Sequence, residues 1–356
     1  MLRQAPCVGA DRGPQRDGGR VARVTIRDVA ARAGVSTATV SRALSGAKRV
    51  SPDIIEQVRR AADELGYAAN GIASALRRSR TDTVGMVVPS ITNPFFTSLV
   101  EGVEHALQDS GQQLFLCSSR SNPALEMQRL RSLVARQVDG IVISPVHGTA
   151  STAAVSWAAG ELPLVQVDRY VTGVDSHWVG VDDDEALRLV VEHLADRGVR
   201  SAAFISSELT SSSTELRVAG FQSHTARLGI TVPPGAMFLG EYSIDWGCSA
   251  MQRLLAAGPL PDAVVCADDL IALGVLQACG TAGVSVPEDV LVTGFDDIAF
   301  AALSDPPLTT VHQPHLGIAA EAVRLLSQRT AGREPHPDRT RLALPPTLVV
   351  RASTGA

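Results

Sequence analysis

The feature that most constrains the fold is an alternation of short β-rich runs with amphipathic stretches, which begins at Thr83 and occurs twice. The first series contains the runs TVGMVVPS, QLFLCSS, GIVISPV, PLVQVDR and HWVGVD, with the helical patterns FTSLVEGVEHALQDSG and EMQRLRSLVARQV between them. The second series contains SAAFISS, RVAGFQSHTARLG, AMFLG, WGCSAMQRLLAAG, AVVCAD, LIALGVLQACGTAG and VLVTGFDD. Such alternation predicts parallel sheets with helices on both faces. We therefore expect two α/β lobes, since 356 residues exceed what one core usually serves.

A second and much smaller pattern precedes the lobes. Thr25 followed by Asp28 fits a helix-capping box, and Gly34 suits the left-handed turn that ends a helix. Ser36 is suited to cap a second helix, and Pro52 to open a third. Three short helices, with a three-residue break between the first two, predict a small all-α helix-turn-helix unit.

Charge is divided sharply along the chain. The net charge is -5, but residues 20–80 hold 12 basic and 5 acidic residues, a net charge of +7. Residues 81–356 carry a net charge of -13. This division predicts that only the small basic unit meets a polyanion. On charge alone a solvated basic face is the simpler interpretation, and the helix-turn-helix pattern is what favours DNA.

The second predicted helix carries small polar side chains on its outward face. The helical period places Thr37, Ala38, Ser41 and Arg42 there. Short side chains let a helix approach the major groove closely, and hydroxyl and methyl groups can contact phosphates, base edges and thymine. Arg42 can donate two hydrogen bonds to guanine. Any small three-helix bundle can show such a face, so the prediction of DNA reading depends on the turn spacing and the charge together.

The stretches VTIRDVAARAGVSTATVSRALSG and VSPDIIEQVRRAADELGYAAN resemble the head of the lactose/galactose-repressor (LacI/GalR) family of bacterial regulators. The resemblance covers residues 24 to about 352. It implies a transcriptional regulator that binds a pseudo-palindromic double-stranded DNA operator as a homodimer. Members of the family are usually repressors, so we expect a repressor. The C-terminal RASTGA has no leucine heptad that would join dimers into a tetramer. The resemblance implies base contacts at Thr37, Ala38 and Arg42, and DNA-backbone contacts at Thr25, Ser36, Thr39, Ser41, Tyr67 and Asn70.

The resemblance also implies a hinge between the head and the lobes. In the family this segment becomes helical on the operator and wedges a leucine into the minor groove, and the matching positions are Ala73 and Leu76. The chain departs from the family in having Ala69 in place of a proline and Ser74 in place of a common arginine. We expect this hinge to be disordered without DNA, with a plain linker as the alternative. The expected domains are a disordered leader (1–22), the helix-turn-helix domain (23–67), the hinge (68–81) and the effector-binding and dimerisation domain (82–352).

By the same resemblance, the two lobes are of the periplasmic-binding-protein type, with an effector cleft between them. Ligands of open α/β sheets bind beyond the carboxyl ends of the strands. Polar and aromatic residues lie near those ends: Asn93, Phe95, Phe96, Asp168, Arg169, Ser213, Arg217, Tyr242, Trp246, Asp268 and Asp296. Carboxylates and guanidinium groups hydrogen-bond to hydroxyls, so we expect a small polar effector, a sugar or sugar derivative.

Several acidic and histidine residues have simpler interpretations. Asp268 stands where the family usually has asparagine, which exchanges a donor for an acceptor and disfavours a phosphorylated ligand. Asp268 and Asp296 could instead cap the helices that follow them, as could their neighbours Asp269 and Asp297. The run at 182–184 is read as an acidic helix start rather than a metal site. His312 and His315 lack a third ligand nearby, so no metal is expected.

Other function classes find little support. A secreted sugar receptor needs a signal peptide, but residues 1–22 have no apolar core. A Rossmann enzyme needs a Gly-rich phosphate loop after the first strand, and GMVVPSITNPFF contains none. No apolar run is long enough for a membrane span, and the five cysteines are scattered without a CxxC pair. We therefore expect a cytoplasmic regulator, not an enzyme, that needs no cofactor. The alternative is a cytoplasmic receptor-like sugar-binding protein or an enzyme without gene control.

Overall fold

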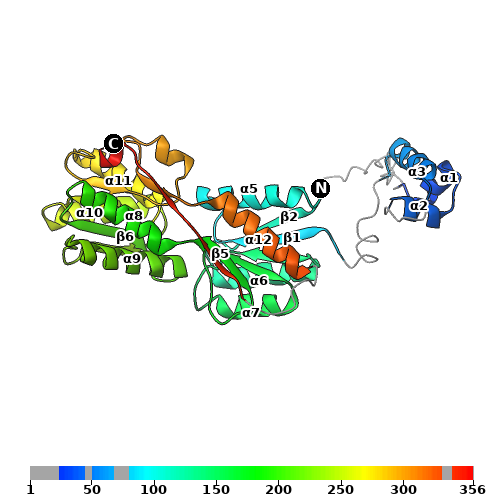
Figure 1. The fold of residues 1–356 in the computed structure, drawn as a ribbon, viewed down its shortest axis with the longest axis horizontal. Helices are drawn as coiled ribbons and strands as arrows, with labels where there is room; N and C mark the ends of the chain where they lie inside the picture. Colours follow the sequence, from blue (N-terminus) through cyan, green and yellow to red (C-terminus); the bar gives the residue numbers. More distant parts are fainter. Residues whose placement is uncertain (1–23, 45–49, 68–79, 331–338, 356) are drawn as a thin grey trace, which may run out of the picture. The chain divides into compact units, whose positions relative to one another are not determined.

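The computed structural model describes residues 24–44, 50–67, 80–330 and 339–355. The chain divides into two compact units, Met1–Ser79 and Arg80–Ala356 (Figure 1). The first unit contains the predicted helix-turn-helix and the second contains the predicted lobes. The expected leader and nearly all of the expected hinge lie outside the described residues, so Asn70, Ala73 and Leu76 stay predictions.

The head unit consists of α1 (Ile26–Arg32), α2 (Thr37–Leu44) and α3 (Pro52–Leu65). The predicted capping box is confirmed, because Asp28 Oδ2 accepts hydrogen bonds from Thr25 N at 2.8 Å and from Thr25 Oγ1 at 2.7 Å. Gly34 is left-handed, with φ of 62°, as the turn requires. The three helices bury Val40 and Val58 in one small core, together with the other apolar residues of their inner faces.

The first lobe of the second unit is built on one parallel sheet in the order β11-β5-β4-β3-β1-β2. Its strands are β1 (Thr83–Val88), β2 (Gln113–Ser118), β3 (Gly140–Ile143), β4 (Leu164–Val167), β5 (His177–Val181) and β11 (Arg341–Leu344). Its helices are α5 (Pro94–Gln108), α6 (Pro123–Ala135), α7 (Thr152–Glu161) and α12 (His315–Thr330). Helices α5 and α12 cover one face of the sheet, and α6 and α7 cover the other (Figure 1).

The second lobe has a parallel sheet in the order β7-β6-β8-β9. Its strands are β6 (Ala202–Ser207), β7 (Met237–Gly240), β8 (Ala263–Cys266) and β9 (Leu291–Thr293). Its helices are α8 (Asp183–Asp196), α9 (Ser212–Leu228), α10 (Ile244–Ala257) and α11 (Asp269–Ala282). Helices α8 and α9 pack on one face, and α10 and α11 on the other. Two parallel sheets with helices on both faces confirm the predicted fold class.

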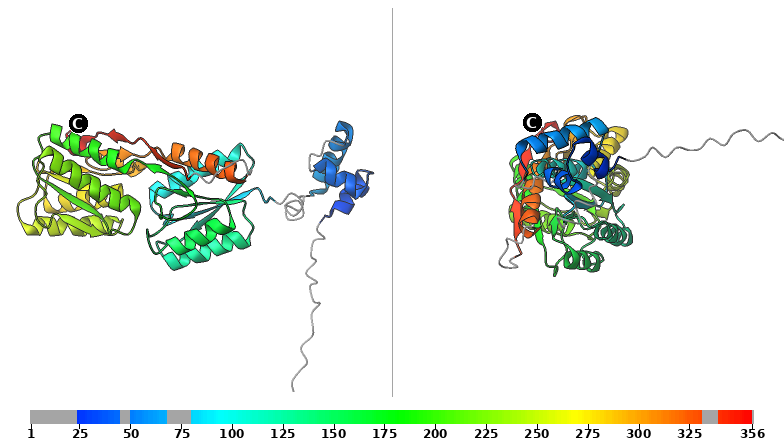
Figure 2. Two further views of the ribbon diagram at one scale, coloured as in Figure 1. Left: turned by 60° about the horizontal axis from the view of Figure 1, so that its bottom comes forward. Right: turned by 90° about the vertical axis from the view of Figure 1, so that its right-hand side faces the viewer.

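The chain crosses between the lobes more than once, which the sequence patterns did not predict. After β9 it forms the short helix η1 (Ala299–Ala302) and β10 (Thr310–His312), and then returns to the first lobe as α12 and β11. It crosses again into β12 (Thr347–Val349), which pairs antiparallel with β10, and ends in the short helix η2 (Ala352–Thr354). The late segments of the chain, drawn in red, therefore run alongside both lobes (Figure 2).

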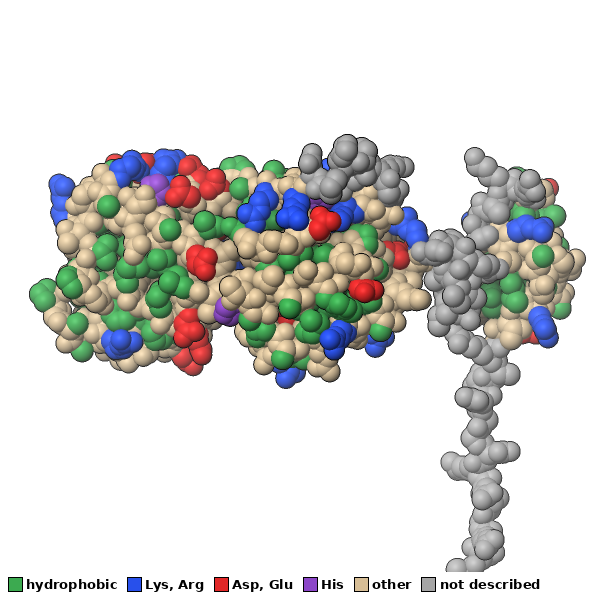
Figure 3. All heavy atoms as spheres, turned by 90° about the horizontal axis from the view of Figure 1, so that it is seen from below, with side chains coloured by type: hydrophobic (Ala, Val, Ile, Leu, Met, Phe, Trp, Pro, Cys, Tyr) green, Lys and Arg blue, Asp and Glu red, His purple; other side chains and the backbone are tan. Residues whose placement is uncertain are grey.

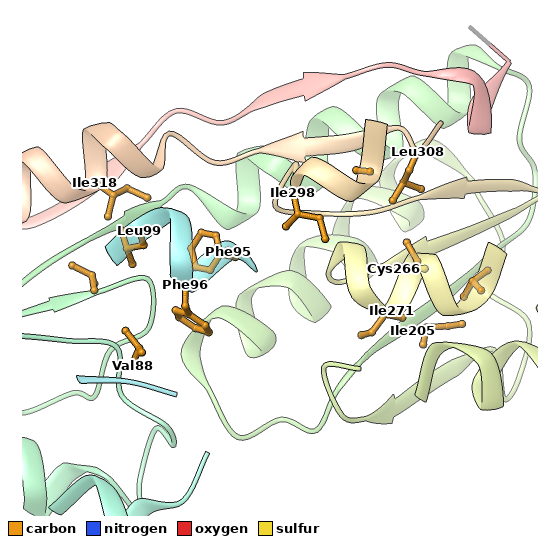
Figure 4. Packing of buried hydrophobic residues seen from close by; sticks show 14 of the residues in the cluster. Val88, Phe95, Phe96, Leu99, Ile205, Cys266, Ile271, Ile298, Leu308 and Ile318 are labelled. Carbon is orange, nitrogen blue, oxygen red and sulfur yellow. The ribbon is translucent and has the colours of Figure 1, made fainter. Parts of the chain in front are cut away.

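Two glycines bring α10 and α11 into close contact. A Cβ atom added at Gly247 would lie 2.0 Å from the Ile271 carbonyl oxygen, and one at Gly274 would lie 2.0 Å from the Ile244 carbonyl oxygen. Buried apolar side chains fill both lobes around these helices (Figure 4). On the face drawn in Figure 3, charged and hydrophobic side chains are interspersed over the lobes. Within the described ranges, no helix is long and apolar enough to cross a membrane.

Candidate functional site

The exposed face of α2 carries the three residues predicted to read bases. Thr37, Ala38 and Arg42 are all exposed, whereas Val40 and Ala43 on the opposite face are buried. The 3.6-residue period predicted this division. The exposed face of α2 therefore presents the hydroxyl and methyl groups of Thr37, the methyl group of Ala38 and the guanidinium of Arg42. Side chains of this kind can contact base edges in a major groove.

The residues predicted to contact the DNA backbone lie mainly at helix starts. Ser36 caps α2, because Thr39 N donates a hydrogen bond to Ser36 Oγ at 3.1 Å, and the two hydroxyl oxygens lie 2.8 Å apart. Thr25 belongs to the capping box of α1, Ser41 is half-buried on α2, and Tyr67 packs against the head core. Helix N-termini present backbone N–H groups and positive dipole ends, which suit phosphate oxygens.

The second unit has a small cavity between its two lobes. Ten of the eleven predicted effector residues line it: Asn93, Phe95, Phe96, Asp168 and Arg169 from the first lobe, and Ser213, Arg217, Tyr242, Asp268 and Asp296 from the second. Figure 4 shows Phe95 and Phe96 at the start of α5 in the first lobe. The rule that ligand residues follow parallel strands therefore brought these side chains together from widely separated positions.

Trp246 does not join this lining. Its indole Nε1 donates a hydrogen bond to the Ser206 carbonyl at 3.0 Å. Its ring also covers Gly240, where an added Cβ would lie 2.4 Å from the indole. Helix α10 begins at Ile244, so Trp246 lies in its first turn and packs against strand ends. Trp246 therefore has a packing role in this arrangement of the lobes, and its contact with an effector stays a prediction.

Asp268 caps a helix and also lines the cavity. It caps α11, because Oδ1 accepts a hydrogen bond from Ile271 N at 2.8 Å. Its other carboxylate oxygen, Oδ2, is buried and has no hydrogen-bond partner among the described residues. Burial raises the pKa of this carboxyl to about 6. A buried acceptor on the cavity lining is available to a ligand donor.

Asp296 is held in an unusual backbone conformation. Its φ is 112°, and Asp168 on the other lobe also has a positive φ, of 59°. Residues other than glycine rarely adopt such angles, and they cluster at ligand sites. Asp296 Oδ1 accepts a hydrogen bond from Gln313 Nε2 at 2.7 Å, and burial raises its pKa well above the usual value. Capping is excluded here, since the residue before η1 is Ile298.

Arg217 is held in place by Asp183, which the sequence predicted to be part of an acidic helix start. Its Nε donates to Asp183 Oδ1 at 2.8 Å and its Nη1 to the Ala267 carbonyl at 2.7 Å. Both side chains are almost fully buried, and burial raises the pKa of Asp183 to about 6 despite the nearby guanidinium. The burial of Asp183 was predictable from the sequence. The helical period places it on the same face as the apolar residues Ala186, Leu187 and Val190.

Arg169 connects the two lobes at the rim of the cavity. Its guanidinium carbon lies 5.7 Å from the ring centre of Phe96 in the first lobe and 5.3 Å from that of Tyr242 in the second. Two hydrogen bonds also join the lobes: Tyr170 N donates to Ser212 Oγ at 2.9 Å, and Gly148 N donates to the Thr210 carbonyl at 2.7 Å. The two lobes are therefore joined by direct contacts.

The side chains that line this cavity mainly form hydrogen bonds. They are carboxylates, guanidinium groups, an amide and aromatic rings, which suit a small molecule rich in hydroxyl groups. Among the described residues, no group of three or more His, Cys, Asp or Glu is arranged to hold a metal ion. His312 lies at the crossover, where Nδ1 is 3.1 Å from Asp297 Oδ2, and its ring packs edge-on against His315.

Comparison with known proteins places both units among regulators. Residues 25–70 match the family described as bacterial regulatory proteins, lacI family, and residues 191–354 match a periplasmic binding protein-like domain. The chain is 33% identical to the ribose operon repressor of Escherichia coli (strain K12) over 329 residues, which cover 92% of this chain and 99% of that protein.

Two solved structures show the same likeness in three dimensions. The lac repressor dimer bound to operator and the anti-inducer ONPF has a TM-score of 0.84 and 28% identity, with 94% of this chain and 99% of that chain covered. A LacI family transcriptional regulator from Enterococcus faecium with bound ribose has a TM-score of 0.67 and 28% identity, with 76% and 98% covered.

Proposed function

The chain belongs to the LacI family of bacterial regulatory proteins, and we propose that it represses its target genes until a monosaccharide binds in the cavity between its lobes. The observation that carries this proposal is the cavity itself, which draws five lining residues from each lobe. A ligand that contacts both lobes changes the free energy of their relative arrangement. A ligand can shift operator affinity only through such a difference between states.

Two phenylalanine residues among the polar lining favour a sugar over other small polar ligands. The aromatic rings of Phe95 and Phe96 supply an apolar surface for the C–H groups of a sugar ring. One relative in sequence is a ribose operon repressor, and the solved structure of the Enterococcus faecium regulator contains bound ribose. D-ribose is therefore the first sugar to test.

DNA binding is assigned to the head, with α2 in the major groove. Thr37, Ala38 and Arg42 form the exposed face that would read base edges, and the helix starts at Thr25 and Ser36 would contact phosphates. We propose a homodimer formed through the lobes, which places two such helices on a pseudo-palindromic operator. The minor-groove contact of Ala73 and Leu76 is part of this proposal and lies outside the described residues. The protein would act in the bacterial cytoplasm, where its operator is.

The test is a thermal-shift screen of the full-length protein against neutral sugars, sugar phosphates, polyols and nucleosides, with D-ribose included. A ligand at 100 times its dissociation constant adds about 2.7 kcal/mol to stability, which a melting curve resolves. We expect a neutral monosaccharide to raise the melting temperature. Asp296→Ala should abolish that rise, whereas Asp245→Ala, an exposed aspartate of α10, should keep it.

The same sugar must then weaken operator binding, measured by fluorescence anisotropy on an operator selected from random DNA. Linkage requires the operator to weaken sugar binding by the same factor. Sugar binding without any selected DNA would identify the alternative, a sugar-binding protein without gene control. A screen in which no small polar compound changes the melting temperature would contradict the effector assignment.

A further inference from the structure

Asp268 is the one lining carboxylate with a buried oxygen that no described protein group satisfies. The residue is 1% exposed, and its Oδ1 is occupied by the backbone of α11. We propose that Asp268 determines which sugars the cavity accepts, because its free Oδ2 accepts a hydrogen bond from a hydroxyl of the effector and excludes a phosphate ester. This inference rests on the proposed function, since it presupposes that the cavity binds a sugar.

The donor has to come from the ligand. An ionised carboxylate can only accept hydrogen bonds, and a buried acceptor without a donor is unfavourable. Oδ2 has almost no accessible surface in this arrangement of the lobes, so a ligand hydroxyl would reach it when the lobes separate. A sugar hydroxyl supplies a neutral donor of suitable size, and its hydrogen bond to a charged acceptor is stronger than one to a neutral acceptor.

The charges around the cavity oppose an anionic ligand. The lining carboxylates are Asp168, Asp268 and Asp296, and the lining guanidinium groups are Arg169 and Arg217. Arg217 is already neutralised by the buried carboxylate of Asp183, and Arg169 lies against Asp168, with 3.5 Å between Nε and Oδ2. Each lining guanidinium therefore already has a carboxylate beside it, and a phosphate that approached it would meet a carboxylate of its own sign.

The substitution Asp268→Asn separates this role from the helix cap. Asparagine caps helices about as well as aspartate, so α11 keeps its first-turn hydrogen bond. The same change removes the negative charge and places either an amide donor or a weaker acceptor toward the ligand. Asp245→Asn is the matched control, because it removes one carboxylate from an exposed position of the same lobe.

Isothermal titration calorimetry of the full-length protein should use matched pairs of probes: D-ribose with D-ribose 5-phosphate, and D-glucose with D-glucose 6-phosphate. We expect the natural protein to bind the neutral member of one pair at least about 100-fold more tightly than its phosphate. Asp268→Asn should weaken the neutral sugar by about tenfold or more, as the loss of a hydrogen bond to a charged group requires. It should also strengthen the phosphate, so that the discrimination falls to below about tenfold, while Asp245→Asn leaves both affinities unchanged.

The outcomes distinguish the inference from the function on which it rests. Equal affinity for both members of a pair, or tighter binding of the phosphate, would overturn the role of Asp268 and leave a sugar-responsive regulator standing. Unchanged discrimination in Asp268→Asn would do the same. If no probe binds either the natural protein or the variant, but a non-sugar ligand from the thermal-shift screen does, then the sugar assignment itself fails.

Discussion

Three consecutive aspartates, Asp182, Asp183 and Asp184, lie in three different environments. Asp182 caps α8 by accepting a hydrogen bond from Glu185 N at 3.1 Å. Asp183 is buried against Arg217, and the largely exposed Asp184 carboxylate lies 3.1 Å from His224 Nε2. Only the middle residue therefore influences the charge of the cavity. The identity of a residue does not reveal this division, because one step along a helix turns a side chain by 100°.

The buried carboxyl of Asp268 predicts a stability that depends on pH. Burial raises its pKa to about 6, whereas an unfolded aspartate titrates near 3.9. Between those values the folded protein binds more protons than the unfolded chain, so stability falls as pH rises from about 4 to about 6. Asp268→Asn should remove this loss. Without added sugar, the variant should be more stable than the natural protein by roughly 1–3 kcal/mol at pH 7.5.

Urea denaturation of both proteins at pH 4 and pH 7.5 checks this prediction. The difference should be much smaller at pH 4, where the carboxyl is protonated in the folded protein and about half protonated in the unfolded chain. A pH-independent difference would show that the substitution acts through packing. The same residue that lowers stability is the one proposed to select the ligand, which is a usual trade-off at functional sites.

At the scale of single elements, α2 is the one whose exposed face is expected to carry sequence specificity. Replacing Arg42 with alanine should weaken binding to the selected operator by roughly 1–3 kcal/mol, since a bidentate contact to guanine has about that value. Binding to random DNA should change much less, because it depends on phosphate contacts. Anisotropy titrations with both DNAs at one salt concentration measure the difference. An equal loss on both would assign Arg42 to the DNA backbone.

The close packing of α10 on α11 predicts that two glycine-to-alanine substitutions in α11 will have different effects on stability. Gly274→Ala would place a methyl group 2.0 Å from the Ile244 carbonyl, so the helices would have to separate. We expect a loss of stability of roughly 1–3 kcal/mol or more, as overpacked cores show. Gly280, also in α11, has no atom within 4 Å of an added Cβ. Gly280→Ala should therefore be neutral or stabilising by about 0.5–1 kcal/mol.

Thermal or urea unfolding of the two alanine variants makes this comparison direct. A similar stability for both would mean that α10 and α11 adjust to the added methyl group without loss. The contrast is informative because both changes raise helix propensity equally. Only the environment of the two glycines differs, and no sequence pattern distinguishes them.

Elements with strong local patterns were predictable from the sequence, and elements fixed by distant pairing were not. The central strands are nearly continuous apolar runs, as parallel strands buried on both faces require. By contrast, β11 alternates exposed and half-buried residues, and it takes its place beside β5, far away in the sequence. Ten cavity residues followed from the strand ends. The packing of Trp246 on Gly240 and its hydrogen bond to Ser206 join residues far apart in the sequence, which no local pattern shows.

At the scale of the whole molecule, exposed apolar side chains in the second lobe indicate where a second copy could bind. Phe300 and Leu303, in and just after η1, are 55% and 79% exposed. Apolar side chains that remain exposed in this way often belong to an interface. If the lobes form the proposed dimer through this region, Leu303→Glu should shift the protein toward a monomer. Analytical ultracentrifugation measures the shift, and Leu209→Glu, another exposed leucine of the second lobe, is the control.

The dimer prediction extends to DNA. A monomer contacts one half-site only, so Leu303→Glu should also lower operator affinity strongly at protein concentrations below the dimer dissociation constant. Sugar binding, which uses residues of one chain, should be retained. A dimeric Leu303→Glu protein would place the interface elsewhere on the lobes.

The contacts that join the two lobes should also limit how fast the protein can respond. Tyr170 is hydrogen-bonded to Ser212, and Gly148 to Thr210, in this arrangement of the lobes. We expect a sugar to enter when the lobes separate, a step that does not depend on sugar concentration. In a stopped-flow experiment, the observed rate should rise with sugar and then level off at the rate of opening. Above that concentration, additional sugar would not shorten the delay before the operator is released.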